Sequence, residues 1–239
     1  MWAREARNAS GQRGGWCEST RWIESYERLA ERAGDLPATR LVQVGDRKSD
    51  ILASMQRAAG LGWPVDLLVR SQQNRRLTNG ARRWDEVPAS VSLGEIEFTL
   101  GARVGRRARV VRQALRLKRV TVGHGAMCLM ASEVGAPAGA KPVCWRLLTN
   151  QHALTLEQAR ELIEGYRARW EIEMFFHVLK TGCRVEALQL ASLDKIARAL
   201  TLFMVVSWRI ARMLRLGRTC PDLPASLMFD PDEIRRRMC

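Results

Sequence analysis

The sequence lacks the features by which membrane spans, disulfide frameworks and metal clusters are usually recognised. Its most apolar run, residues 199–208, is too short to cross a bilayer and has arginines on both sides, so we expect no membrane segment. None of the six cysteines forms a C-x-x-C pair or matches a zinc spacing, which indicates reduced thiols in a cytoplasm. The three histidines are too dispersed to predict a metal cluster. Residues 1–15 contain no apolar stretch, so we expect disorder there and no signal peptide.

Acidic residues are scarce relative to basic ones. The chain has 39 Lys and Arg against 25 Asp and Glu, a formal net charge of +14 over 239 residues. Such a charge attracts polyanions, and nucleic acid is the commonest of them. The charge alone does not decide the class, because a ribosome-like or merely soluble basic protein would share it, and GC-rich coding also enriches arginine.

One stretch places chemically active side chains on a single helix face. Residues 166–180, YRARWEIEMFFHVLK, are predicted to lie in one long helix. Thr155 and Gln158 provide a capping box at its start, and Gly182 ends it. At about 100° per residue, four side chains fall within a stripe about 60° wide: Tyr166, Arg169, Glu173 and Lys180. The plain alternative is an amphipathic helix with intrahelical ion pairs such as Arg169–Glu173.

A strand, a helix and a second strand follow one another over residues 41–70. Leu41–Gly45 and Val65–Arg70 read as buried strands, which predicts a parallel pair with a right-handed crossover. Asp46 follows the first strand directly, so its carboxylate lies at a sheet edge and suits Mg²⁺; a helix N-cap is the alternative. Asp50 is expected at the N-terminus of the crossover helix, where its negative charge is favourable.

The pattern changes to a period of two over residues 71–150, which predicts an antiparallel sheet. No acid occurs between Glu97 and Glu133, while arginines and lysine recur. A strand face of one sign is a plausible surface for DNA phosphates, and a solvated face that mixes both signs is the alternative. The basic residues are Arg103, Arg106, Arg107, Arg109, Arg112, Arg116, Lys118 and Arg119.

Further helices are expected on either side of this region. Residues 19–33 carry apolar side chains at helical spacing, and residues 190–216 do the same. The prolines that follow residue 220 break the second of these helices. Residues 230–239 read as a charged tail.

The spacing Y-x2-R-x3-E-x6-K resembles the Y-R-E-K signature of DDE transposases of the insertion-sequence-four family, the group that includes the transposase of transposon five. The flanking W-x-I-E and K-T-G strengthen this similarity. Three other stretches resemble motifs of the same family: ESTRW, GDRKSDI and PVCWRLLT. The resemblance covers about residues 16–215.

The resemblance implies an α/β fold, namely a partial ribonuclease-H-like fold with an inserted antiparallel β-sheet. The expected divisions are residues 1–15, disordered; 16–70, first ribonuclease-H-like part; 71–150, inserted β domain; 151–216, second ribonuclease-H-like part with the catalytic helix; and 217–239, a tail.

The resemblance also implies the site residues. Asp46 and Glu173 correspond to the second and third acids of the DDE triad, and are expected to be catalytic and to bind Mg²⁺ or Mn²⁺. In the family, the tryptophan that Trp145 matches stacks on a flipped base; a tryptophan of the sheet core is the alternative. The expected DNA-binding residues are Arg70, Trp145, Tyr166, Arg169, Trp170 and Lys180.

The function implied is a cut-and-paste DNA transposase that hydrolyses phosphodiesters and transfers strands at transposon ends, in the bacterial cytoplasm on the nucleoid. The first catalytic aspartate has no counterpart, because Asp35 lies in a Gly-Asp-Leu-Pro turn that no strand precedes. We therefore expect an inactive portion, truncated at the N-terminus, that stops short of the C-terminal dimerisation region, so that a homodimer is doubtful. The alternatives are a non-catalytic DNA-binding remnant, an inhibitor of an intact transposase, or a generic basic RNA-binding protein.

Overall fold

The computed structural model describes residues 18–77, 79–101, 107–120 and 126–237. The chain divides into two compact units, and the boundary along the sequence falls between residues 167 and 168. Each unit is described by itself. Within the described residues, no helix is both long and apolar enough to span a membrane.

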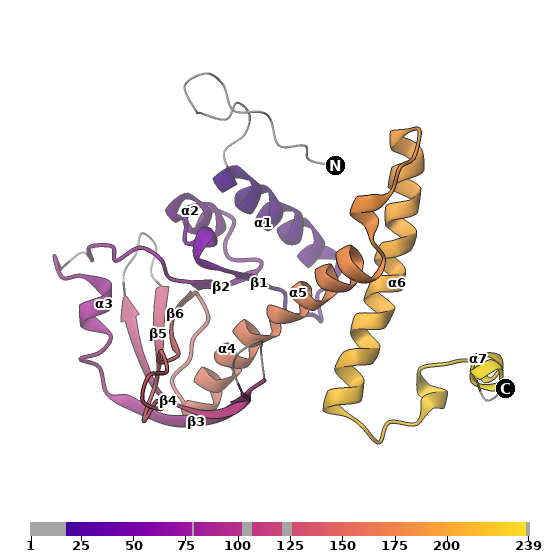
Figure 1. The fold of residues 1–239 in the computed structure, drawn as a ribbon. Coiled ribbons are helices and arrows are strands. Elements are labelled where there is room, and N and C mark those ends of the chain that lie inside the picture. The colour runs from indigo at the N-terminus through magenta and orange to yellow at the C-terminus, as the bar shows by residue number, and fades with distance from the viewer. Residues whose placement is uncertain (1–17, 78, 102–106, 121–125, 238–239) are drawn as a thin grey trace. The chain divides into compact units, whose positions relative to one another are not determined.

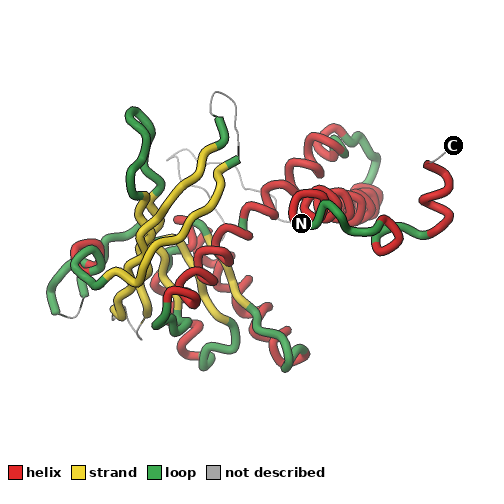
Figure 2. The backbone as a smooth tube through the Cα atoms, turned by 90° about the horizontal axis from the view of Figure 1, so that it is seen from below, coloured by secondary structure: helices red, strands yellow, loops and turns green. Residues whose placement is uncertain are grey.

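The first unit is built on one six-stranded sheet (Figures 1 and 2). The strand order is β1-β2-β6-β5-β4-β3, in which β1 and β2 are parallel and all other neighbours are antiparallel. The strands are β1 Val42–Gly45, β2 Asp66–Arg70, β3 Ser92–Leu100, β4 Arg109–Val120, β5 Ala126–Glu133 and β6 Cys144–Thr149. This arrangement confirms the α/β class, the parallel pair and the antiparallel strands expected from the sequence.

The antiparallel strands belong to the same sheet as the parallel pair. Strand β2 pairs with β6, with Arg70 opposite Leu147 and Leu68 opposite Thr149. The expected boundary between residues 70 and 71 therefore falls within one continuous sheet.

Helices cover both faces of this sheet, and alternate strand residues point to each face. Leu68 and Leu147 pack in one core cluster with Ile163 of helix α4, whereas Leu67 and Leu148 belong to a second cluster. This is the alternation that a period of two imposes on a sheet buried on both sides. The helical segments are α1 Glu18–Asp35, a 3₁₀ turn Arg47–Ser49, α2 Leu52–Gly60, α3 Arg83–Glu86 and α4 Leu156–Ala168.

The helix expected over residues 155–182 is interrupted. Its capping box is confirmed, because the Gln158 amide donates to Thr155 Oγ1 and the Thr155 amide donates to Gln158 Oε1, both at 3.2 Å. A turn at Arg169 then separates α4 from α5, Trp170–His177, and a π-helical turn, Val178–Gly182, follows. The prediction of one regular helix was therefore wrong. The break could not be foreseen from the sequence, because neither glycine nor proline stands at it.

The second unit is helical in its described part. The long helix α6, Leu193–Thr219, confirms the expected helix and ends at Cys220. The segment expected to be a charged tail forms a further helix, α7, Pro231–Arg237, with Asp232 and Glu233 in its first turn, where acids are favourable. Two 3₁₀ turns, Val185–Ala187 and Ala225–Leu227, complete the unit.

Candidate nucleic-acid and metal-binding site

The carboxyl ends of the parallel strands bring Asp46 and Arg70 to one edge of the sheet. Asp46 follows β1 directly and Arg70 is the last residue of β2, with Gly45 opposite Val69 in register. Asp46 is half-buried and is the N-cap of the 3₁₀ turn, because its Oδ1 accepts from the Lys48 amide at 2.9 Å. The alternative interpretation of Asp46 as an N-cap is therefore confirmed. No hydrogen bond joins its Oδ2 to any residue in the described part of the chain, so one oxygen remains for a cation.

Arg70 is half-buried, and its guanidinium donates to the Cys144 carbonyl at 3.3 Å. This contact anchors the guanidinium to the neighbouring strand β6 and leaves further N–H donors at the edge. A guanidinium fixed in this way suits a phosphate, whose oxygens accept two parallel hydrogen bonds.

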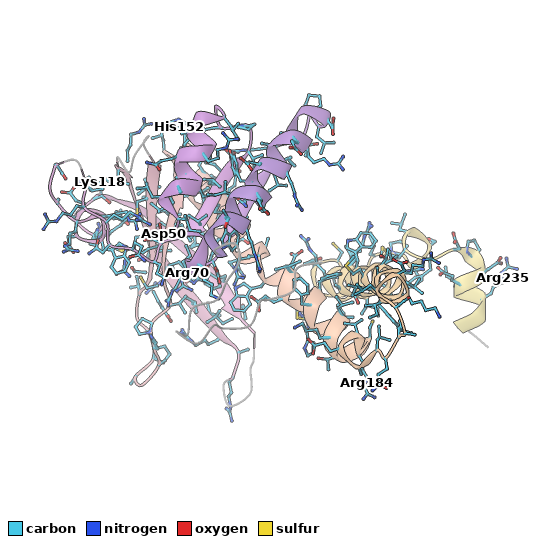
Figure 3. The ribbon with its side chains drawn as sticks, turned by 90° about the horizontal axis from the view of Figure 1, so that it is seen from above. Asp50, Arg70, Lys118, His152, Arg184 and Arg235 are labelled. Atoms are coloured by element: carbon cyan, nitrogen blue, oxygen red, sulfur yellow. The ribbon has the colours of Figure 1, made fainter. Side chains whose placement is uncertain are left out.

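Asp50 lies at the same edge and is buried (Figure 3). Its Oδ2 accepts from the amides of Gln72 and Gln73 at 2.7 and 2.8 Å. Its carboxylate also meets the guanidiniums of Arg83 at 3.2 Å and Arg75 at 3.4 Å. The prediction that Asp50 supports the start of a helix was wrong, since Ile51 is the N-cap of α2 and Asp50 is bound to distant segments.

An aromatic cluster contains two of the residues expected to bind DNA. Trp145 of β6 is only 9% exposed and stacks on Phe98 with ring centroids 5.4 Å apart. Tyr166 of α4, 3% exposed, meets Trp145 edge-on at 5.7 Å, and the Arg167 guanidinium lies over Phe98 at 4.3 Å. The alternative of a core tryptophan describes Trp145 in this structure, and the contacts of Trp145 and Tyr166 with DNA stay predictions.

The other expected site residues lie in the second unit. Arg169 forms an ion pair with Glu173 at 3.0 Å and lies over the Trp170 ring at 5.3 Å. The Glu173 carboxylate is 52% exposed and Trp170 is 44% exposed. Lys180, in the π-helical turn, pairs with Glu186 at 3.0 Å. The intrahelical pair anticipated as the plain alternative is present, and it leaves one Glu173 oxygen without a described hydrogen-bond partner.

The expected site residues thus form three groups. Asp46 and Arg70 share a sheet edge, Trp145 and Tyr166 touch in the core, and Glu173 contacts Arg169 in the second unit. The pairing of Asp46 with Glu173, which belong to different units, stays a prediction.

Strand β4 does not present the one-sided basic face that the sequence suggested. Arg109 forms a bidentate pair with the buried carboxylate of Glu133, and this guanidinium holds the pKa of Glu133 below its usual value. Arg112 meets Glu95 at 3.3 Å, and Lys118 pairs with Glu86. The prediction was wrong because neighbouring segments place acids beside the strand, which a linear reading cannot see.

Two of the remaining basic side chains of this region have contacts with other residues, and a third, Arg107, is exposed. Arg116 donates to the Ser90 carbonyl, and Arg119 contacts His152 at 2.9 Å (Lys118 and His152 are labelled in Figure 3). Arg103 and Arg106 lie outside the described residues.

In the described residues, the candidate ligands for a hard divalent cation are separate carboxylates and do not form a cluster. The described ranges contain no group of three or more His, Cys, Asp or Glu that could hold a metal ion. Mg²⁺ is commonly held by one or two carboxylates, several waters and the phosphates of its substrate. Asp46 and Glu173 are each partly exposed and each keeps an oxygen without a described partner, so both fit that role.

Two family models match the chain. Residues 70–208, more than half of it, match the transposase DDE domain, and residues 205–238 match the transposase Tn5 dimerisation domain. The second match overturns the expectation that the chain stops short of the dimerisation region. It covers the end of α6 and all of α7, the segment that the sequence suggested was only a tail.

Proposed function

We propose that this chain, which belongs to the DDE transposases of the Tn5 type, acts on transposon ends. The proposed reactions are metal-dependent phosphodiester hydrolysis and strand transfer. The observation that carries the proposal is the match to the DDE domain over residues 70–208, which contains Arg70, Trp145 and the whole Y-R-E-K spacing. The net charge of +14 supports a polyanionic partner. The proposed setting is the bacterial cytoplasm, on the nucleoid.

In this proposal, Asp46 and Glu173 hold Mg²⁺ or Mn²⁺. When bound, such ions activate water or a 3′ hydroxyl and stabilise the leaving oxygen. The N-cap bond from the Lys48 amide fixes one Asp46 oxygen, and the other is proposed to bind the cation. The Arg169 guanidinium orients the Glu173 carboxylate in the same way, through one of its oxygens.

The DNA end is proposed to meet cationic and aromatic side chains. Arg70, Arg169 and Lys180 supply donors for phosphate oxygens, and Trp170 is exposed enough to stack on a base. For Trp145 and Tyr166 the proposal requires the aromatic cluster to open, because Phe98 covers one face of Trp145 and Tyr166 meets its edge.

We infer that the chain by itself binds transposon ends without cutting them. By the family resemblance, Asp46 and Glu173 match two positions of the triad, and no other acid of the chain matches the third. Asp35 is the last residue of α1 and pairs with Arg32 at 3.6 Å, so it does not sit on a strand of the described sheet. The match to a dimerisation domain favours a second candidate role, in which the chain pairs with an intact transposase and inhibits it.

The test is a cleavage and binding assay on a duplex that carries a transposon end, with Mg²⁺. The proposal predicts salt-sensitive binding that prefers the end over an unrelated duplex, and no nicking. Nicking that disappears in Glu173→Gln and persists in Glu171→Gln would establish an active enzyme and refute the inferred inactivity. Glu171 is the matched control because it is an exposed acid of the same helix that pairs with Arg215. Equal affinity for RNA and both duplexes would refute the transposase assignment of the site.

A further inference from the structure

Two acids form hydrogen bonds at opposite ends of the parallel strands β1 and β2. At the amino ends, Asp66 accepts from Arg40 at 2.6 Å and from the side-chain amide of Asn150 at 2.8 Å. At the carboxyl ends, buried Asp50 accepts from backbone amides and arginines of the segment that follows β2. Only the second acid lies on the edge that carries Asp46.

The loop between Asp46 and Asp50 is held at several points. Ser49 Oγ donates to the Asp46 carbonyl at 2.6 Å, and the Lys48 amide donates to the Asp46 carboxylate. Ser49 packs so closely on Gly45 that a Cβ at Gly45 would overlap its side chain. These contacts fix the shape of the loop, and Asp50 fixes its far end to the rest of the sheet.

The anchor at Asp50 depends on a buried guanidinium. Arg83 is fully buried, and its terminal nitrogen also reaches Ser71 Oγ at 2.7 Å and the Gln73 carbonyl. Its Nε and second terminal nitrogen have no hydrogen-bond partner among the described residues. A buried carboxylate or guanidinium that loses its partner destabilises the fold, because its charge is then uncompensated. The Asp50–Arg83 pair therefore favours one geometry of the loop.

We propose that Asp50, held by Arg83, is a positioning residue that sets the orientation of the Asp46 carboxylate toward a divalent cation. This inference rests on the proposed role of Asp46 as a metal ligand. Asp50 itself does not meet the cation, because its Oδ2 is committed to two amides and Arg83 and its Oδ1 meets the Arg75 guanidinium. Partners that orient a metal ligand in this way typically change metal affinity by about 10–100-fold when they are lost.

The test is Mn²⁺ binding by the full chain, measured by electron paramagnetic resonance on folded variants. We expect Asp50→Asn to weaken Mn²⁺ binding by about 10–100-fold. Asp66→Asn is the matched control, since it removes a carboxylate that joins the same strands at the other end, and we expect unchanged affinity.

A double variant separates positioning from charge and guards against misfolding. Asp50→Asn with Arg83→Met removes both buried charges, and the asparagine oxygen still accepts from the amides of Gln72 and Gln73. We expect this variant to fold and to recover most of the lost affinity, because the loop keeps its anchor. No recovery in the folded double variant would overturn the positioning role in favour of a direct electrostatic one.

The outcomes also distinguish this inference from the proposed function. Full Mn²⁺ affinity in Asp46→Asn would refute the metal role of Asp46 itself. Weakened binding in Asp46→Asn, together with unchanged binding in Asp50→Asn, would refute only the positioning role. Equal weakening in Asp50→Asn and Asp66→Asn would also overturn it, because the effect would then reflect general loosening of the strands.

Discussion

The two carboxylates that we propose as metal ligands differ in how firmly the fold holds them. Asp46, in the first unit, belongs to a loop that is tied to the sheet through buried Asp50 and Arg83. Glu173, in the second unit, lies on an exposed helix, and its one partner among the described residues is Arg169, one turn before it. The first carboxylate is fixed by the fold, whereas the second can turn with little cost, since exposed ion pairs contribute little free energy. Under the proposed function, Asp46 would therefore be the more rigid of the two metal ligands and Glu173 the more mobile one.

The largest expected effect is on the free energy of unfolding and concerns the buried Asp50–Arg83 pair beside Asp46. Arg83→Met leaves a buried carboxylate without its main charged partner and should lower the free energy of unfolding by about 3–5 kcal/mol. Urea unfolding followed by tryptophan fluorescence measures this. The control is Arg215→Met, which breaks an exposed pair with Glu171 and should cost at most about 1 kcal/mol. Similar losses in both variants would contradict the contrast between the two regions.

The next effect separates two tryptophans that the family resemblance assigns to DNA. Trp145→Ala removes a buried ring that packs on Phe98 and should cost about 3–5 kcal/mol of stability. Trp170→Ala removes an exposed ring and should leave the unfolding midpoint nearly unchanged. It should instead weaken end binding by about 1–3 kcal/mol, the worth of one stacked base. Fluorescence anisotropy with labelled end DNA, beside thermal unfolding, reports both quantities.

A smaller effect is the pH dependence contributed by Glu133. The Arg109 guanidinium lowers the pKa of the Glu133 carboxyl in the folded chain. A lowered folded-state pKa stabilises the fold above the unfolded pKa of about 4.3, and this contribution disappears as the pH falls through the folded-state value. The stability gap between the unmodified chain and Glu133→Gln should therefore shrink below about pH 4. Arg109→Gln should shift this pH dependence toward the unfolded pKa, and a gap that grows on acidification would exclude the assignment.

The smallest expected effect concerns the flexible carboxylate. Glu173→Gln breaks one exposed pair on a helix and should change stability by less than about 0.5 kcal/mol. The same variant should lose Mn²⁺ affinity, because an amide is a weaker ligand for a hard cation than a carboxylate is. Chemical denaturation and Mn²⁺ titration of one preparation give both results. A large stability loss would show that Glu173 has a structural role instead.

Local patterns predicted the elements well. The capping box at Thr155, the parallel strands around Asp46 and the breaking prolines after residue 220 each depend on neighbours in sequence, and the structure contains all of them. The helix α7 carried a local signal too, because Asp232 and Glu233 follow a proline at its start, and this signal was overlooked in favour of a tail.

Features that depend on distant partners could not be predicted. The bonds of Asp50 reach residues 22 to 33 positions away, so nothing near it in the sequence marks it as an anchor. The acids beside β4 come from other segments, as Glu133 does for Arg109. The burial of Trp145 follows from the face of β6 on which it lies, and period two fixes alternation without saying which face is covered.

The proposed function requires above all that Asp46 and Glu173 bind the same cation. Iron(II) in place of Mg²⁺, with ascorbate and peroxide, cleaves a protein backbone near bound metal, and mass spectrometry locates the cuts. We expect cuts around both residues 46 and 173, with both sets reduced in Asp46→Asn and in Glu173→Gln. Cuts near only one residue, or two sets that respond independently to the substitutions, would contradict it.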